Sequence, residues 1–315
     1  MSFSVLLIGL ITFVELNCEN LFDTEHDSLK NDYDFMPTAI KHWTKNRYWE
    51  KLDNIGREIL ACGGDSSNWT PPDLVALCEV ENDSVMRDLT NRSLLRNVRY
   101  KYVMTNSPDI RGIDVALLYS PFSFCLVNYY SLHVDPLKGM RQTRDILYVC
   151  GVLPDNDTIH VFVVHAPSRF GGEKNTRSHR LKVAEVLCNA TDSIYLKHPD
   201  ARIIIAGDFN DYTGSASMNY ISKHKLMDVS EKAVGRNGAG GTYKYKGDWH
   251  SLDHIFFSEK LQHDCNDCYV MDASFLIKAD SKFGGVEPWR SYIGPRYQKG
   301  FSDHLPLVVK FCCTY

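Results

Sequence analysis

The sequence predicts an α/β fold of the α+β type, in which two mixed β-sheets pack together and are flanked by helices. Three observations support this prediction. Apolar, β-rich runs occur along the whole chain without regular alternation with helices, only two segments have a long helical period, and no linker divides the 315 residues. A doubly wound parallel sheet would need a helix after nearly every strand. We therefore expect one domain that spans residues 1–315.

In the first half of the chain, residues 43–62 have apolar side chains at helical spacing with charged residues between them. This pattern is typical of a helix that lies on a sheet. The apolar positions are Trp49, Leu52, Ile55 and Ile59. The other elements expected here are an apolar extension or leading strand over residues 1–11, a buried strand over 74–78, a short helix over 83–91 and a strand over 114–119.

In the second half, residues 177–197 form the second helical pattern. Before it, the β-rich runs 146–153 and 159–164 are joined by a turn at 154–157, as in a hairpin. The remaining expected elements are strands over 202–206, 252–258 and 304–311, a glycine-rich loop over 235–241, and a long irregular insertion over 262–300.

The composition is that of an ordinary globular protein, with 44% hydrophobic and 23% charged residues. The formal net charge of −4 argues against a protein that coats nucleic acid by bulk electrostatics. A local basic cleft is compatible with this charge. Its candidate members are Arg141 with Arg144, residues 169–180, and the aromatic and basic stretches 241–250 and 287–300.

The sequence leaves the compartment open between cytoplasmic and exported. The apolar N-terminus has the length of a signal peptide but lacks a basic leading region and a clear cleavage site, and it is too short for a stable membrane span. Most of the ten cysteines are expected to be reduced, because several lie in apolar runs. Cys265 and Cys268 follow His263 at a spacing that could suit zinc, but a single pair is a weak signal and its role stays open.

Six short strings place carboxylate, amide or imidazole groups beside apolar runs: FVELNCENLFD, LVALCEVEN, VVHAPSR, AGDFND, SLDHIFF and FSDHLPLVV. Strand ends of this kind are where active sites are commonly built. Hydrolysis of a phosphate ester needs a cation, an activated water and donors for the non-bridging oxygens. Oxygen ligands suit magnesium, with manganese as the alternative. The candidate ligands are Asn17, Glu79, Asp303 and Glu19.

The other polar groups of these strings are candidate catalytic residues. Asp208 and Asn210 should lie near the reacting phosphate, and His165 and His304 can donate hydrogen bonds or exchange protons. Each histidine needs a partner that fixes its tautomer. The expected partners are Asp253 for His304 and Asp114 for His165.

The strings NCEN, CEVEN, VVHAPSR, GDFND, SLDH and SDHLPL resemble the endonuclease/exonuclease/phosphatase superfamily. This superfamily includes deoxyribonuclease I-like nucleases, abasic-site endonucleases, inositol polyphosphate 5-phosphatases, neutral sphingomyelinases and deadenylases. The resemblance extends from about Thr12 to Lys310, and the order of GDFN, LDH and SDH makes it specific. It implies a four-layer α/β sandwich of the deoxyribonuclease I-like type that uses a divalent metal.

The resemblance also implies metal-binding roles. Asn17 and Glu79 match the metal-binding Asn and Glu of the family, and Asp303 matches a carboxylate near the metal. Glu19 is a weaker match. Cys78 departs from the pattern, because many members have Gln before the metal-binding Glu. Since the Glu itself is present, we expect activity to be retained.

For the catalytic residues, the resemblance implies in-line attack by water on a phosphate polarised by the metal. Asp208 and Asn210 match the pair that orients the water and the phosphate. His304 matches a histidine at the scissile phosphate, with Asp253 as its orienting carboxylate. His165 stands where deoxyribonuclease I-like members have a catalytic histidine and abasic-site enzymes have tyrosine.

Substrate choice should depend on the loops rather than on the shared core. We expect the insertion 262–300 and the loop 235–250 to select the substrate. Ser168 matches a small polar phosphate contact of relatives, and Arg144 an arginine that approaches the substrate. The candidate substrate-binding residues are Ser168, Arg169, Tyr243, Trp249 and Trp289.

The leading interpretation is a monomeric, nuclease-like phosphodiesterase, whose phosphate-ester substrate could be nucleic acid. The alternative is a phosphomonoesterase or phospholipase that acts on inositol phosphates or sphingomyelin. A third reading, from another class, is a catalytically silent binding module. Such modules usually lose a metal ligand, and no expected ligand is missing from this sequence.

Overall fold

Strands dominate the structure, and two long helices accompany them. The computed structural model describes residues 8–64, 69–169 and 172–314. The strands of the two large sheets are β1 (Ile8–Leu21), β2 (Leu74–Val80), β3 (Lys101–Met104), β4 (Asp114–Tyr119), β5 (Cys125–Leu132), β6 (Ile146–Val152), β7 (Thr158–His165), β8 (Arg202–Asp208), β9 (Leu226–Asp228), β12 (Asp253–Ser258), β13 (Cys265–Val270) and β18 (Leu307–Thr314). Short hairpin strands are β10 (Tyr243–Tyr245), β11 (Asp248–His250), β14 (Ile277–Ala279), β15 (Val286–Pro288), β16 (Tyr292–Ile293) and β17 (Arg296–Tyr297). The helices are α1 (Lys45–Ala61), α2 (Asp83–Asn91), α3 (Glu173–Tyr195), α4 (Ala216–Ser222) and α5 (Glu259–Gln262), with 3-10 turns η1 (Tyr33–Phe35) and η2 (Leu94–Asn97).

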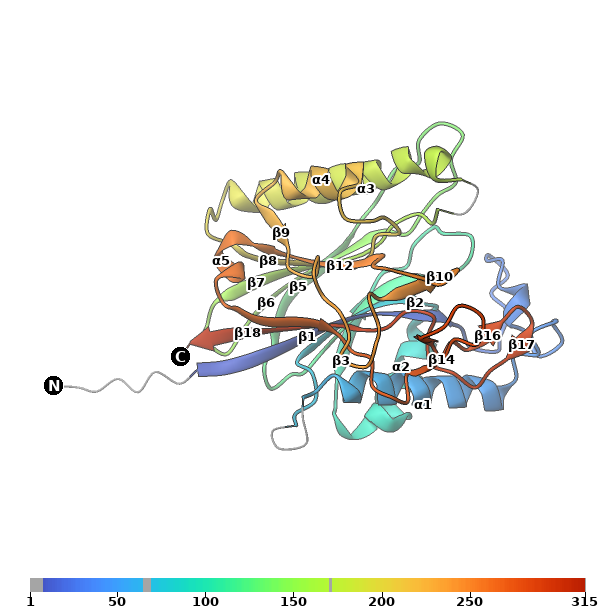
Figure 1. Ribbon diagram of the computed structural model, residues 1–315. Coiled ribbons are helices and arrows are strands. Elements are labelled where there is room, and N and C mark those ends of the chain that lie inside the picture. Colours follow the sequence, from blue (N-terminus) through green and yellow to red (C-terminus); the bar gives the residue numbers. More distant parts are fainter. Residues whose placement is uncertain (1–7, 65–68, 170–171, 315) are drawn as a thin grey trace.

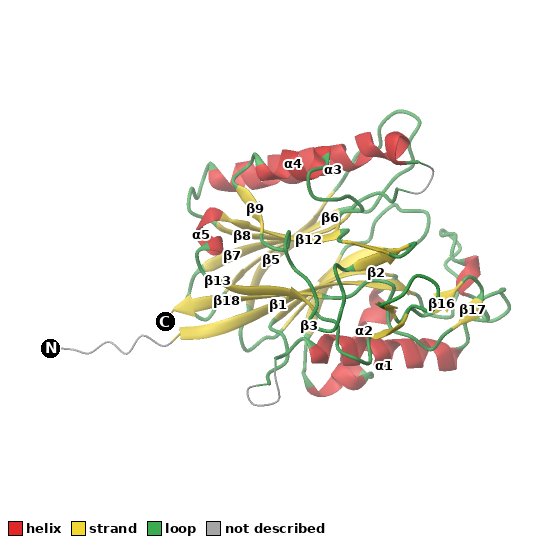
Figure 2. Ribbon diagram, in the orientation of Figure 1, coloured by secondary structure: helices red, strands yellow, loops and turns green. Residues whose placement is uncertain are grey.

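Two six-stranded mixed sheets pack face to face, and helices cover their outer faces (Figures 1 and 2). The first sheet has the order β13-β18-β1-β2-β4-β3, and the second has the order β5-β6-β7-β8-β12-β9. Helices α1 and α2 contribute buried side chains to the core behind the first sheet, and α3 and α4 contribute to the core behind the second. The predicted four-layer sandwich is confirmed.

Strand alternation divides the apolar residues among three cores. On β1, Ile11 and Phe13 belong to the core between the sheets, whereas Val14 and Leu16 face the helices. This two-residue period follows from the pleat of a strand. The strands β2 and β8 are buried along their whole length because both faces of their sheets are covered.

Most elements expected from the sequence are present. Helix α2 and strand β4 have the predicted bounds, and β6 and β7 form the predicted hairpin. Of the apolar N-terminus, residues 8–11 begin β1 and pair with β18, so they are a leading strand. Residues 1–7 lie outside the described part of the chain.

The prediction of an irregular insertion over residues 262–300 is wrong in part. The segment contains β13, which pairs with β18 and forms an edge of the first sheet, and two short hairpins. The sequence CNDCYV mixes polar and apolar residues because an edge strand faces solvent. The last strand begins at Leu307 rather than at His304. Pro306, which lacks a backbone N–H, stands just before it.

The structure also bears on the cysteines and on membrane association. All ten cysteines are free thiols. Cys265 and Cys268 lie on β13 and are not part of the single group of potential metal ligands found among the described residues. Within the same residues, no helix has the length and apolar character needed to cross a bilayer.

Candidate active site

Polar side chains from both sheets meet at one end of the sandwich. Asn17 on β1 donates a hydrogen bond from Nδ2 to Oδ2 of Asp208, at the end of β8, at 3.0 Å. Nε2 of His165, at the end of β7, lies 3.6 Å from Oδ2 of Asp208 and 3.9 Å from Oε1 of Glu79. The structure therefore brings together four of the predicted site residues across the gap between the sheets.

The alternation of the strands explains why three of these side chains meet. Asn17, His165 and Asp208 have the same parity along their strands as the residues of the central core, so they point between the sheets. Asp253 on β12 follows the same rule through Ile255 and Phe257. The neighbouring His254 points the other way and contacts Asp228 and the carbonyl of Asp211.

Glu79 breaks the alternation. Leu77 and Val80 both face the helices, and the pairing of β2 shifts between Cys78 and Val80. Glu79 itself has φ +62°, in the left-handed region that side-chain-bearing residues rarely adopt. Such a bulge redirects a side chain. It turns the Glu79 carboxylate toward His165 instead of leaving it under the helices.

Left-handed backbone occurs at three other non-glycine residues of this end of the sandwich. Glu19 has φ +50°, Asn20 has φ +58° and Asn210 has φ +50°. The pairing of β1 with β2 shifts between Asn17 and Leu21, across two of these residues. Strained backbone of this kind is retained where surrounding contacts hold it, and it often accompanies function.

The carboxylate of Glu79 is oriented by its neighbours. The backbone N–H of Asn20 donates to Oε2 at 2.8 Å, and Nη2 of Arg111 lies 3.5 Å from Oε1. The neighbouring Cys78 donates from Sγ to the carbonyl of Val164 at 3.3 Å. This contact joins β2 of the first sheet to β7 of the second directly behind the Glu79 position.

Asp208 is fixed by the residues on both sides of it. The backbone N–H of Asn210 donates to Oδ1 at 2.8 Å, and Nδ2 of Asn210 donates to Oδ2 at 3.1 Å. Burial, and then the nearby carboxylate of Asp253, raise the pKa of Asp208 to about 7. Gly207 must be glycine because its φ is +147° and a Cβ there would lie 1.8 Å from the carbonyl oxygen of Val164.

His304 is paired with the predicted partner. Nδ1 of His304 lies 2.7 Å from Oδ2 of Asp253, which also accepts a hydrogen bond from Oγ1 of Thr242 at 2.5 Å. Burial opposes the charged imidazolium, but the Asp253 carboxylate outweighs it and the pKa of His304 lies well above its usual value. The ring of Tyr243 packs against His304, with centroids 4.9 Å apart.

The expected pairing of His165 with Asp114 is wrong. Asp114 begins β4, where Oδ1 accepts hydrogen bonds from the hydroxyls of Thr105 and Ser107, both at 2.5 Å. Nδ1 of His165 has no hydrogen-bond partner among the described residues. Burial, followed by the charge of Arg144, holds the pKa of His165 well below its usual value. His165 is therefore a neutral imidazole, and Asp114 ties down the loop before its own strand.

Asp303 and Glu19 are linked by a common cation. Nη2 of Arg290 lies 2.5 Å from Oδ2 of Asp303, and Nε lies 3.4 Å from Oε1 of Glu19. Glu19 also accepts a hydrogen bond from the N–H of Ser291 at 2.6 Å and lies 3.8 Å from Nζ of Lys51. Both carboxylates are thus held by the segment around Arg290.

The other predicted polar residues have different surroundings. Arg144 is buried and donates to the carbonyls of His165 and Ala166, at 3.1 and 2.7 Å, and to Asp109 at 2.8 Å. It therefore supports the backbone beside the candidate catalytic groups. Arg169 stacks on the ring of Tyr212, whereas Ser168 lines a cavity next to Arg144.

The two predicted tryptophans mainly serve packing. Trp289 donates from Nε1 to the carbonyl of Gln298 at 3.0 Å and packs against Phe301. Trp249 lies against Gly240, and both tryptophans pack on the core between the sheets.

Sequence reasoning missed the residues that hold the predicted ones. These are Asn20 and Arg111 at Glu79, Arg290 at Asp303, and Thr242 at Asp253. Arg290 belongs to a stretch that the sequence marks as basic and aromatic, and Arg111 lies just before β4. A cation close in sequence to a predicted site residue is the signal that could have identified both arginines: Asp303 follows Arg290, and Asp114 follows Arg111.

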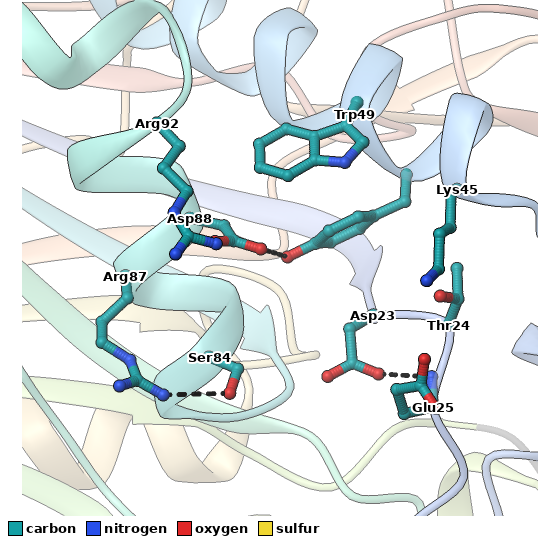
Figure 3. A pocket seen from close by; sticks show the side chains of 10 residues that line it. Asp23, Thr24, Glu25, Lys45, Trp49, Ser84, Arg87, Asp88 and Arg92 are labelled. Carbon is teal, nitrogen blue, oxygen red and sulfur yellow. Dashed lines mark hydrogen bonds and ion pairs between the residues drawn. The ribbon is translucent and has the colours of Figure 1, made fainter.

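A second cavity, of about 400 Å³, lies between α1 and α2 (Figure 3). Its lining has three basic and three acidic residues, and none of the predicted site residues. Arg92 lies 2.9 Å from Asp88, and the close view shows the two side chains turned toward each other. Because its charges balance, this cavity has no evident preference for a phosphate.

The donor set at the sheet ends fits a divalent cation. Asp208, Asp253 and His304 offer ligand atoms within 4.8 Å of one another. However, Oδ2 of Asp253 already accepts two hydrogen bonds, and Oδ1, which has no partner among the described residues, belongs to a fully buried side chain. The carboxylate of Glu79, with the amide of Asn17, is the better match for a cation that prefers oxygen ligands. Such an ion would also relieve the repulsion of Glu79 and Asp208, which contributes to the raised pKa of Asp208.

The comparisons with known proteins identify the family. Residues 12–312 match the model that describes the Endonuclease/Exonuclease/phosphatase family. The fold is that of a hydrolase of phosphate esters, and the chain belongs to the endonuclease/exonuclease/phosphatase family. No curated protein matches the sequence.

Solved structures share the fold over nearly the whole chain. An endonuclease/exonuclease/phosphatase family protein from Bacteroides thetaiotaomicron is 16% identical, with a TM-score of 0.62, covering 97% of this chain and 98% of that one. A mannosyl-6-phosphatase from the same species is 17% identical, with a TM-score of 0.62 and coverages of 95% and 98%. The human Nocturnin catalytic domain, solved with a bound sulfate anion, is 18% identical, with a TM-score of 0.59 and coverages of 97% and 95%.

Proposed function

We propose that this protein is a divalent-metal-dependent phosphoesterase that hydrolyses phosphodiester bonds in the manner of a nuclease, by in-line attack of an activated water. The observation that carries this proposal is the position of Asp208. Its carboxylate accepts hydrogen bonds from Asn17 of the opposite sheet and from Asn210, and Nε2 of His165 lies 3.6 Å away. A carboxylate held by three neighbours at the gap between two sheets is placed to act on a bound water.

The metal would be held by Glu79 and Asn17, with Asp303 nearby. Magnesium is the expected ion and manganese the alternative, because all three residues offer oxygen ligands. When bound, such an ion neutralises charge that develops on the phosphate oxygens. Glu79 is prepared for this role by the N–H of Asn20, which fixes one carboxylate oxygen and leaves the other facing His165.

The proton roles follow from the charges of the groups. Asp208 can accept a proton from water near neutral pH, because burial and Asp253 raise its pKa to about 7. His304 carries a positive charge that Asp253 stabilises, so it donates to a phosphate oxygen. His165 is neutral and can donate one hydrogen bond to another oxygen without adding charge.

A second candidate is hydrolysis of a phosphomonoester. It is supported by the cavity of about 280 Å³ that adjoins the site through Arg111 and Arg144, since this is the size of a small ligand rather than of a duplex. Measuring hydrolysis of a panel of substrates, with and without a chelator, would separate the two candidates. The panel contains single-stranded and duplex nucleic acids, sugar phosphates, inositol polyphosphates and sphingomyelin.

The test of the proposal is replacement of Asp208. Asp208→Asn keeps the shape of the side chain but removes the base, and turnover should fall by several orders of magnitude while the melting temperature changes little. Asp34→Asn is the matched control, because the Asp34 side chain is 71% exposed and lies outside the site. Full activity of Asp208→Asn on every substrate of the panel would overturn the proposed mechanism.

A further inference from the structure

Beside the proposed catalytic groups lies a cavity of about 280 Å³ that is formed by four separate segments of the chain. We call it the arginine pocket. It is lined by residues 109–111, 140–144 and 167–168 and by three residues of the start of α3, Asn175, Thr176 and His179. The charged groups of this lining are Asp109, Arg111, Arg141 and Arg144.

The pocket is positively charged. Its one carboxylate, Asp109, is neutralised by Arg144 at 2.8 Å. Arg111 and Arg141 remain. Arg111 is paired outside the pocket with Glu79, at 3.5 Å, whereas Arg141 is exposed and forms no ion pair with any described residue. The start of α3 adds the positive end of a 23-residue helix to the same wall. A pocket with this balance favours an anion.

The wall also contains polar atoms that lack partners. Oγ1 of Thr143 and Nε2 of His179 are buried without a hydrogen-bond partner among the described residues, although Thr143 is only 4% and His179 only 7% exposed. Buried polar atoms are almost always bonded, because leaving one unbonded costs free energy. The wall of this one small pocket therefore has unused hydrogen-bonding capacity.

The pocket adjoins the proposed catalytic centre through two shared arginines. Arg111 lines the pocket, and its Nη2 also lies 3.5 Å from Oε1 of Glu79. Arg144 lines it as well and holds the carbonyls of His165 and Ala166. Asn210, which orients Asp208, donates to the same Ala166 carbonyl at 3.1 Å. A molecule whose reacting phosphate lies at Asp208 would therefore extend into the pocket.

We infer that the arginine pocket binds a second phosphate group of the substrate, one that is not hydrolysed. This inference rests on the proposed phosphoesterase function and names its substrate class: phosphate esters that carry a second phosphate close to the reacting one. The second phosphate could belong to the adjoining position of a nucleic acid strand or to a small molecule with two phosphates. Both sources present anionic phosphate oxygens to Arg141 and Arg111.

The first experiment measures binding without catalysis. Inorganic phosphate is titrated calorimetrically into Asp208→Asn protein and into the double variant Asp208→Asn with Arg141→Ala. Loss of one charge-assisted contact should weaken phosphate binding about tenfold. The matched control is Arg57→Ala in the same background, because Arg57 is an exposed arginine on α1 outside the pocket. Equal affinity in the Arg141→Ala and Arg57→Ala proteins would overturn the inference.

A second variant separates an effect on phosphate binding in the pocket from an effect on folding. Thr143→Val keeps the shape of the side chain and removes a hydroxyl that has no partner, so the melting temperature should stay equal or rise. Phosphate affinity should nevertheless fall. A variant that loses stability and keeps phosphate affinity would show that Thr143 serves the fold alone, and would count against the pocket.

The kinetic experiment distinguishes the two phosphate sources. Substrate pairs that differ only in the second phosphate are compared: a terminally phosphorylated dithymidylate with the same dinucleotide lacking that phosphate, and fructose bisphosphate with fructose monophosphate. The doubly phosphorylated member of one pair should have the lower KM, and Arg141→Ala should reduce that preference about tenfold. No preference within either pair refutes the inference. If phosphate binding depends on Arg141 but no substrate is turned over, the proposed function fails while the pocket stands.

Discussion

At the scale of single residues, the buried carboxylates of Asp253 and Asp114 have different partners. Asp253 holds His304, whereas Asp114 holds hydroxyls of its own loop. Asp253→Asn should therefore lower kcat by about a hundredfold or more, because the imidazolium loses its stabilising charge. Asp114→Asn should change kcat far less. Steady-state kinetics of the two variants tests the assignment, and equal losses would contradict it.

Glu58 gives a pH dependence of stability that is independent of catalysis. It is fully buried on α1, both of its carboxylate oxygens lack a partner among the described residues, and burial raises its pKa from 4.5 to about 8. Between pH 4.5 and about 8, the carboxyl group of Glu58 is thus protonated in the folded state and deprotonated in the unfolded state. Stability from this group is present below about pH 4.5 and is lost as the pH rises toward 8.

Glu58→Gln should remove this loss. Since one pKa unit corresponds to about 1.4 kcal/mol, the variant should be more stable than the parent by a few kcal/mol at pH 8 and similar to it in acid. Urea unfolding across this pH range measures the difference. A constant difference between parent and variant at all pH values would show that Glu58 does not titrate in the folded state.

At the scale of elements, helix α1 is connected to the segment that carries Arg290. Lys51 is 1% exposed, and its Nζ donates to Oγ of Ser291 at 2.7 Å and to the carbonyl of Phe301. Lys51→Met should destabilise the fold by about 3 kcal/mol, because Glu19 and these acceptors lose their cation.

Lys45→Met is the control for this variant, since Lys45 lies on the same helix and is exposed. Its effect should stay within about 0.5 kcal/mol. Chemical denaturation compares the two proteins. A similar small effect in both would mean that the link between α1 and the Arg290 segment does not contribute to stability.

Elements whose apolar residues recur at a regular spacing could be predicted from the sequence, and edge strands could not. Helices α1 and α2 and strand β4 carry patterns that burial on one or both faces imposes. Strand β5 is exposed at most of its positions and β13 is partly so, and their sequences therefore lack the alternation that marks a half-buried strand. For the same reason the segment that contains β13 resembled an irregular loop.

The site was predictable at the strand ends because polar residues there interrupt apolar runs. Asn17, His165 and Asp208 meet as expected, since simple alternation points them between the sheets. The orientation of Glu79 depends on a bulge with left-handed backbone, which leaves no mark in a single sequence. The pairing of carboxylates with histidines also depends on how the two sheets pack, which the sequence does not show. For this reason the predicted pairing of His165 with Asp114 is wrong.

At the scale of the whole molecule, metal binding should be coupled to folding. The proposed ligands Asn17 and Glu79 lie on two separate strands, β1 and β2, so the ion can bind them together only in the folded protein. Magnesium should therefore raise the melting temperature in a concentration-dependent way, and a chelator should reverse the increase.

Glu79→Ala should abolish this stabilisation, because it removes an oxygen ligand from the first sheet. Arg57→Ala should leave it unchanged. Thermal scans with and without magnesium provide the measurement. An unchanged magnesium response in Glu79→Ala would place the ion elsewhere in the molecule.

The position of β18 between β13 and β1 has a consequence for biosynthesis. Strand β1 pairs with β18 in an antiparallel ladder from Ile8 to Glu15, although the two strands lie at opposite ends of the described chain. Pairing of strands so far apart in the sequence is slow, because closing the long loop between them costs conformational entropy. During translation, β18 also leaves the ribosome after every other strand of the sheet. Until then the nascent polypeptide exposes an unpaired apolar edge along β1, so chaperone occupancy during translation should fall only when residues 307–314 have emerged.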